Sequence, residues 1–377
     1  MPTEKSRSFF YSRRRINIKE FLAPLSLLFT LLLLFIISPV FSSNSYQSYF
    51  NQKAYGDGLT QENLPPASVG DRQASLFVKI NPAILTTENK GNAFIQFRLF
   101  DAKDNRTFEH VTYEITLRKG TGVTTRTTTT PASDQKPLLR DFFHAHNGLL
   151  TLKIRPSNGT LIINADQEPF QNAWVADPGG SISVKGPILL EGGLYNFEVS
   201  IFGIDNDRNL FIPENAPKFN SSLSVGDIYH YNVTDKNNKK YNLSLISYYD
   251  KIRGLNFVPA NNTLSWAMPF NWNLDRLKNV KIFVHEEISI PRSADFTASR
   301  SYSGTVNGVD IPKNLMIDTT KPEKDVIHFM LPKDRLIQMA EQMNKNGQES
   351  SNGLMKFTLQ PGDNSGSNRA KNAVSAS

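Results

Sequence analysis

The chain has 377 residues and contains no cysteine, which excludes disulfides, thiol catalysis and metal sites built on cysteine. Its net charge of +7 is concentrated near the start. Residues 1–20 carry six Lys or Arg and two Glu, which leaves 36 basic against 33 acidic residues, or +3, for the remainder. That surplus is too small for a nucleic-acid-binding surface, so we expect no nucleic-acid partner.

The first predicted element is an apolar run over residues 21–41 without a charged side chain, preceded by a basic cytoplasmic segment in residues 1–20. A helix of this length spans about 31 Å, close to the hydrocarbon thickness of a bilayer. The run therefore predicts a transmembrane helix whose downstream residues lie on the extracytoplasmic side, with the membrane as a partner. The alternative is a signal peptide that is cleaved near Ser42, after which the protein is secreted.

Two segments lack apolar periodicity. Residues 42–70 are polar and contain Gly, Pro, Ser and Asn, which is typical of a flexible stalk. Residues 361–377 also lack an apolar pattern and are expected to form a disordered tail.

Between these segments the hydrophobic pattern has a period of two. In residues 195–201, for example, Tyr195, Phe197 and Val199 alternate with polar side chains. Many short runs of this kind, separated by turn residues, predict an all-β protein with two immunoglobulin-like β-sandwich domains, at residues 71–205 and 206–360. The other expected strands lie near residues 74–80, 95–99, 110–119, 137–145, 149–155, 181–189, 226–234, 240–249, 282–287, 299–306, 325–331 and 354–359.

Two local patterns refine this expectation. Tyr195 follows the turn Glu191-Gly192-Gly193 and starts an alternating strand, an arrangement that predicts a tyrosine corner. Near the C-terminus, residues 333–345 follow Pro332 and place apolar side chains on one face, which predicts one short helix packed on a sheet.

Histidines supply the first candidate site. His144 and His146 are two positions apart, so on a strand both imidazoles point to the same face. If residues 110–119 pair with 137–146 as a hairpin, with 119 near 138, His110 joins them. Three imidazoles without a thiolate suit Cu(II) or Zn(II). A structural or solvent-facing role for histidines beside the turn at Asn147-Gly148 is the alternative.

Oxygen side chains supply the second candidate. Asp205 and Asp207 follow a strand at the expected domain junction, in a spacing that resembles the start of a calcium loop. The EF-hand pattern then fails at Leu210 and Ala216, so a plain polar turn is the alternative to a bound Ca²⁺.

No sequence motif indicates catalysis. His285-Glu286-Glu287 lacks the H-E-x-x-H spacing of zinc proteases and lies in an expected strand, and no nucleophile elbow or phosphate-binding loop is found. We therefore expect no catalytic residues.

Four stretches together carry a family resemblance: residues 62–71, 139–144, 186–195 and 282–287. They resemble a group of uncharacterised exported or membrane-anchored proteins of ammonia-oxidising archaea. That resemblance implies a cell-envelope location and a copper-rich physiology, and it assigns no function to single residues.

These observations leave two main hypotheses for function. One is a membrane-tethered β-sandwich protein with a structural, adhesive or partner-binding role, whose partner is an envelope protein or a glycan. The other is an envelope Cu- or Zn-binding accessory protein that uses His144, His146 and His110. A hydrolase of envelope sugars or peptides is a third, for which no site can be named.

Overall fold

The computed structural model describes residues 60–120, 136–168, 172–206, 210–279, 282–294, 301–345 and 353–362. The expected membrane anchor at 21–41 and residues 363–377 of the expected tail lie outside the described residues. Among the helices within the described ranges, none combines the length and the apolar character needed to cross a bilayer.

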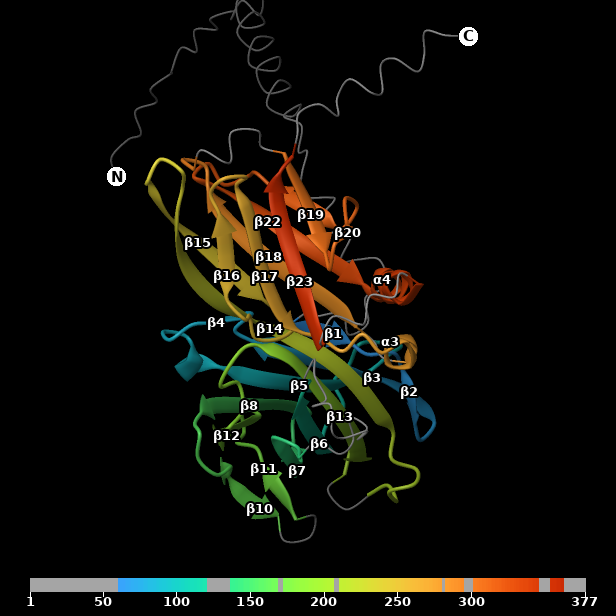
Figure 1. Ribbon diagram of the computed structural model, residues 1–377. Helices are drawn as coiled ribbons and strands as arrows, with labels where there is room; N and C mark the ends of the chain where they lie inside the picture. Colours follow the sequence, from blue (N-terminus) through green and yellow to red (C-terminus); the bar gives the residue numbers. More distant parts are fainter. Residues whose placement is uncertain are drawn as a thin grey trace, which may run out of the picture. The chain divides into compact units, whose positions relative to one another are not determined.

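The protein is mostly β, and its first sheet has seven strands in the order β1-β3-β5-β8-β12-β9, with β2 beside β3 (Figure 1). Most neighbours are antiparallel, whereas β8 and β12 are parallel. The strands are β1 (Gln61–Asn63), β2 (Ala67–Val69), β3 (Arg72–Asn81), β5 (Phe94–Asp101), β8 (Leu149–Pro156), β9 (Ile162–Asn164) and β12 (Ser181–Gly186).

An eleven-stranded sheet follows the order β10-β11-β7-β6-β13-β14-β15-β18-β22-β21, with β4 beside β14. Its strands are β4 (Ile84–Leu85), β6 (Val111–Lys119), β7 (Leu139–Ala145), β10 (Asp166–Glu168), β11 (Ala173–Val175), β13 (Gly193–Gly203), β14 (Lys218–Thr234), β15 (Lys240–Ser247), β18 (Phe283–Pro291), β21 (Leu315–Asp318) and β22 (Lys324–Pro332).

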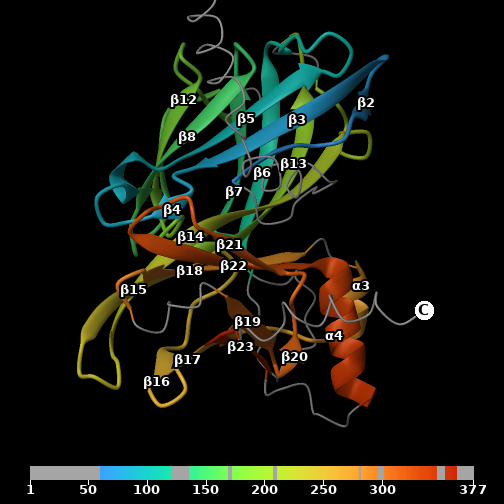
Figure 2. The ribbon, with the colours of Figure 1, turned by 90° about the horizontal axis from the view of Figure 1, so that it is seen from above.

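A five-stranded sheet has the order β16-β17-β23-β19-β20. Its strands are β16 (Leu255–Val258), β17 (Thr263–Pro269), β19 (Tyr302–Val306), β20 (Val309–Asp310) and β23 (Leu354–Pro361). The described residues also form a 3-10 turn, η2 (Lys90–Asn92), and the helices α3 (Leu274–Asn279) and α4 (Lys333–Lys345), which contact each other. Both helices lie beside the strands of the second core (Figure 2).

Two hydrophobic cores result from this arrangement. The first lies between the seven-stranded sheet and β6, β7, β13 and the first half of β14, and it includes Phe97, Phe143 and Phe197. The second lies between the other half of the eleven-stranded sheet and the five-stranded sheet, with Trp266 and Phe329 among its members. Since the described chain has no disulfide, burial of these side chains is the main source of its stability.

Strand β14 takes part in both halves of the molecule. Lys218–Val225 pairs with β13, and Asp227–Thr234 pairs with β15. Phe219, Leu223 and Val225 belong to the first core, so the change from one core to the other occurs within β14, about twenty residues after the boundary expected at 205/206. Gly226 marks the crossing, where an added Cβ would lie 2.8 Å from Ile246.

The expected stalk at 42–70 is wrong for its last part. Residues 61–69 contain β1 and β2, and Leu64 and Val69 are buried in the first core. Each of these edge strands has three residues, so each turns only one or two side chains to the core and no periodicity can be seen in the sequence. Residues 42–59 lie outside the described ranges.

The predicted helix over 333–345 is confirmed by α4, whose buried side chains include Leu336, Ala340 and Met343. Helix α3, which is only six residues long, was not predicted from the sequence. Strands β16 and β17 and the first half of β14 were not predicted either, although Leu264, Trp266 and Met268 alternate as a half-buried strand requires.

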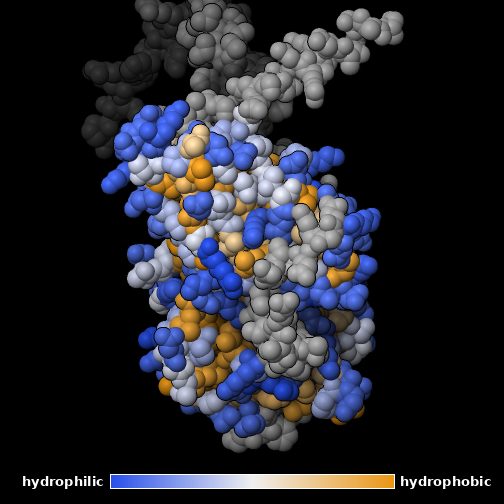
Figure 3. Space-filling model, in the orientation of Figure 1, coloured by the Kyte–Doolittle hydropathy of each residue, from blue (hydrophilic) through white to orange (hydrophobic). Residues whose placement is uncertain are grey.

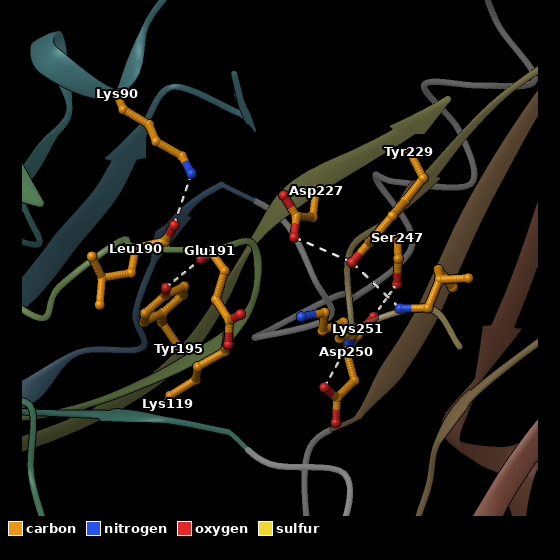
Figure 4. A network of polar contacts seen from close by, with 11 residues as sticks. Lys90, Lys119, Leu190, Glu191, Tyr195, Asp227, Tyr229, Ser247, Asp250 and Lys251 are labelled. Atoms are coloured by element: carbon orange, nitrogen blue, oxygen red, sulfur yellow. Dashed lines mark hydrogen bonds and ion pairs between the residues drawn. The ribbon is translucent and has the colours of Figure 1, made fainter. Parts of the chain in front are cut away.

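The predicted tyrosine corner is confirmed. The Tyr195 hydroxyl donates to the Glu191 carbonyl at 2.6 Å, and Lys119 forms an ion pair with the Glu191 carboxylate (Figure 4). The hydrogen bond from Lys119 lowers the pKa of Glu191. The turn also contacts the second half of the protein, since Leu194 N donates to the Tyr249 carbonyl at 3.2 Å. Figure 4 also shows a neighbouring group of contacts, in which the Tyr229 hydroxyl donates to the Asp227 carboxylate.

Candidate metal centre

The structure brings together the three histidines that the sequence analysis singled out. His144 is the penultimate residue of β7, His146 lies in the following turn, and His110 immediately precedes β6. Each offers one nitrogen, and these three nitrogens all lie within 4.8 Å of one another. They form a group of possible metal ligands at one end of the β6–β7 pair.

Pairing of β6 with β7 produces this proximity. Thr112 lies opposite His144 and Val111 opposite Ala145, so the register continues to place His110 beside His146. The expected register was one residue off, because it put residue 110 near 147. The backbone confirms the observed register, since His110 N donates to the His146 carbonyl at 2.8 Å. Both segments that carry the ligands are therefore tied together at the site itself.

The three rings pack closely at one end of the β6–β7 pair. Their centroids are 4.8 Å apart for His144 and His146, 5.3 Å for His110 and His146, and 6.2 Å for His110 and His144. His144 is 1% exposed, whereas His146 is exposed and His110 is half-buried. An ion can therefore reach the site from solvent through His146.

Donor distances suit a metal. The Nδ1 atoms of His110 and His146 are 3.4 Å apart. Two nitrogens bound tetrahedrally to Zn(II) at about 2.05 Å are separated by about 3.3 Å. The donor nitrogen of His144 lies within 4.8 Å of the donor nitrogens of the other two rings.

Thr112 orients the buried ring. Its Oγ1 lies 2.9 Å from His144 Nδ1. When this hydroxyl accepts a hydrogen bond from Nδ1–H, the lone pair of the imidazole is on Nε2, the form that binds a metal. A residue that binds the far nitrogen of a ligating histidine is the usual outer partner of such sites.

The turn after His146 is held by sterics and by a buried tyrosine. Gly148 has a φ of +72°, and an added Cβ would lie 1.6 Å from the Phe108 carbonyl oxygen, so only glycine fits. The Tyr113 hydroxyl donates to the Gly148 carbonyl at 2.7 Å and accepts from Leu99 N at 3.2 Å. Burial raises the pKa of Tyr113, which keeps this hydroxyl protonated. His146 is thus presented from a rigid turn.

The expected calcium site is only partly within the described residues. The Asp205 carboxylate forms an ion pair with Arg72, and the backbone N of Asp205 donates to the Glu109 carbonyl at 2.7 Å. Asp207 lies outside the described residues. The Ca²⁺ interpretation of this pair stays a prediction.

A second group of possible ligands was not predicted. His285 and Glu287 on β18 converge with His328 on β22. In the sequence, His285 belongs to a stretch that lacks the spacing of a helical zinc motif, and His328 stands more than forty residues further along the chain. The spacing of two residues between His285 and Glu287, which places both on one face of a strand, was the available signal. The partner strand could not be identified from the sequence.

Burial sets the charge of the second group. Desolvation lowers the pKa of His285 to about 4, so its imidazole is neutral near pH 7. Burial alone would raise the pKa of Glu287, but the hydrogen bond to His328 and the nearby imidazoles outweigh it and lower that pKa. An ionised carboxylate therefore lies beside a neutral imidazole.

Comparisons with known proteins give no identification: no family model, no curated protein and no solved structure matches the chain.

Proposed function

We propose that the protein is a metal-binding accessory protein that holds one Cu(II) or Zn(II) ion between His110, His144 and His146. The observation that carries this proposal is the convergence of three imidazole nitrogens within 4.8 Å, from two segments joined by a backbone hydrogen bond. If these histidines served only as polar side chains of the fold, three imidazole rings packed against one another would not be required.

The donor set favours particular ions. Imidazole nitrogens suit Zn(II), Cu(II) and Ni(II), and with similar ligands Cu(II) binds most tightly of these. Three protein ligands leave a further coordination position for solvent or for a donor from a partner. Such an open site fits delivery or storage of the ion better than a closed structural site does.

The cellular setting of this proposal comes from the sequence. The apolar run at 21–41 after a basic segment supports tethering on the extracytoplasmic side of a membrane, with secretion after cleavage near Ser42 as the alternative. The tyrosine corner and the two hydrophobic cores, each enclosed between two layers of strands, support immunoglobulin-like domains. A purely structural, adhesive or partner-binding role, with an envelope protein or a glycan as partner, is the competing hypothesis.

Titration of the full-length chain, purified in a mild detergent and stripped with a chelator, tests the proposal. We expect Cu(II) to bind in competition with a chromophoric chelator, and we expect His144→Ala with His146→Ala to lower the affinity by at least about 100-fold, because two of three ligands are lost. His230→Ala is the matched control, since His230 is exposed on β14 and far along the chain from the cluster. Equal Cu(II) affinity in the double variant and the parent protein would contradict the proposal.

A further inference from the structure

We propose a second metal site, of the two-histidine, one-carboxylate type, in which His285, Glu287 and His328 bind Zn(II). It is built on other strands than the three-histidine site, and it does not depend on the function proposed above. Three lines of geometry support it: the strand register, the distances between donor atoms and the groups that surround them.

Strand register sets the three ligands on one face. His285 and Glu287 are two residues apart on β18, and His328 on β22 lies directly opposite Glu287. Val284 and Ile288, which flank this pair, belong to the second hydrophobic core, so the ligands point to the opposite face of the sheet. Two central, hydrogen-bonded strands therefore fix the positions of all three donors.

Distances among the donor atoms match the edges of a tetrahedron around a metal. His285 Nε2 lies 3.1 Å from His328 Nδ1, and Glu287 Oε1 lies 3.4 Å from the first nitrogen and 3.5 Å from the second. Ligands bound tetrahedrally to Zn(II) at about 2.05 Å are about 3.3 Å apart. All three separations agree with this value within a few tenths of an ångström.

The 3.1 Å separation of the two imidazole nitrogens also fits a hydrogen bond, whereas the two contacts of Glu287 are long for one. Charge-assisted N–H···O bonds between imidazole and carboxylate are about 2.7–2.9 Å long, shorter than both observed contacts of Glu287. The three donor atoms surround a common centre with nearly equal edges. A single ion at this centre would satisfy the carboxylate and both lone pairs at once.

The surroundings resemble those of known metal sites. The Tyr248 hydroxyl donates to Glu287 Oε1 at 3.1 Å, and its ring stacks on His285 with centroids 4.7 Å apart and planes within 5°. Met330, opposite His285 on β22, is fully buried. His285 and His328 are nearly inaccessible, while the Glu287 side chain is 16% exposed and gives an ion access from solvent. Outer groups of this kind orient ligands and strengthen binding.

Zn(II) titration of the full-length chain in detergent tests this site in a background that carries His144→Ala and His146→Ala. We expect this background to bind one equivalent of Zn(II) and to unfold at a higher temperature with the metal, because Zn(II) stabilises the folded state to which it binds. Addition of His285→Gln and His328→Gln is expected to abolish both effects. His230→Gln, an exposed histidine on β14, should change neither.

Two results would overturn the proposal: no Zn(II) uptake by the background protein, or one equivalent retained after both ligands are replaced. If the histidine variants fail to fold, Glu287→Gln provides the test, since its amide oxygen can still accept the hydrogen bond from Tyr248 while the negative charge is removed. We expect it to weaken Zn(II) binding by at least about 10-fold, and unchanged affinity would also overturn the site. Failure of the three-histidine site would instead appear as equal metal binding by the parent and the background proteins.

Discussion

Replacement of Trp266 by alanine is expected to lower the free energy of unfolding by about 3–5 kcal/mol, the range for removal of a large buried aromatic side chain. Trp266 is 3% exposed at the centre of the second core. Its ring stacks on Phe357 with centroids 5.3 Å apart and meets Phe329 edge-on at 5.1 Å. Phe329 and Phe357 are themselves in edge-on contact at 5.5 Å, so the variant removes the common neighbour of both rings.

Urea unfolding followed by circular dichroism measures this loss. Trp266→Phe should cost clearly less, because a ring of the same orientation can keep part of both contacts. Val258→Ala, on the adjacent strand β16, is the surface control: Val258 is 39% exposed, and we expect a change within about 0.5 kcal/mol. Equal stability of Trp266→Ala and Val258→Ala would contradict the second core as described.

Replacement of Glu286 by glutamine is expected to stabilise the protein increasingly as the pH rises. Glu286 is fully buried on the core face of β18. Its chain neighbours His285 and Glu287 point to the opposite face of the sheet. Glu286 Oε1 lies 2.7 Å from Ser247 Oγ, and Glu286 Oε2 has no hydrogen-bond partner among the described residues. Desolvation raises the pKa of Glu286 well above its ordinary value of 4.5, and the charges of Asp250 and Glu287 raise it further.

The hydrogen bonds agree with a protonated carboxyl group. Ser247 Oγ also contacts the Asp250 carbonyl at 2.6 Å, and the hydroxyl has one proton to donate. If that proton goes to the carbonyl of Asp250, Glu286 must donate to Ser247. A glutamine amide can donate in the same place, so Glu286→Gln preserves the contact and removes the ionisable group.

The direction of the pH effect follows from proton binding. Below the unfolded-state pKa of about 4.5, Glu286 is protonated in both states and costs nothing. Above it, the unfolded chain releases the proton and the folded chain keeps it. The free energy of unfolding of the parent protein therefore falls by about 1.4 kcal/mol per pH unit from this group, until the pH reaches the raised folded-state pKa.

Urea unfolding between pH 4 and pH 8, with a chelator present, measures the difference between Glu286→Gln and the parent protein. That difference should be near zero at pH 4 and grow in favour of the variant, because all other titrating groups are shared. Glu341→Gln, on the exposed face of α4, should show no such trend. A difference that is independent of pH would show that Glu286 titrates normally.

Much of the fold could be predicted because its strands obey a period-two pattern. The β6, β7, β8 and β13 predictions agree with the structure because each strand turns at least two large side chains to the first core. Edge strands such as β1 and β2 are too short for a pattern to be seen. The long strand β14 could not be predicted as one element, because Ser221 stands between Phe219 and Leu223 at a position where the alternation requires an apolar side chain.

The two candidate sites differ in how much of their geometry is local in sequence. His144 and His146 are near neighbours, and the hairpin that brings His110 to them joins adjacent strands in the chain. The second cluster requires the pairing of β18 with β22, which are separated in the chain by the strands β19, β20 and β21. Long-range pairing is set by packing of the whole core, and a single sequence carries little information on it.

The most direct test of the central claim is the location of the ion itself. Crystals of the full-length protein grown with Cu(II) would show anomalous scattering at the copper absorption edge. We predict a peak between His110, His144 and His146, within about 2.0–2.1 Å of a nitrogen from each ring. Anomalous density elsewhere, with no peak among these three rings at full Cu(II) loading, would contradict the account.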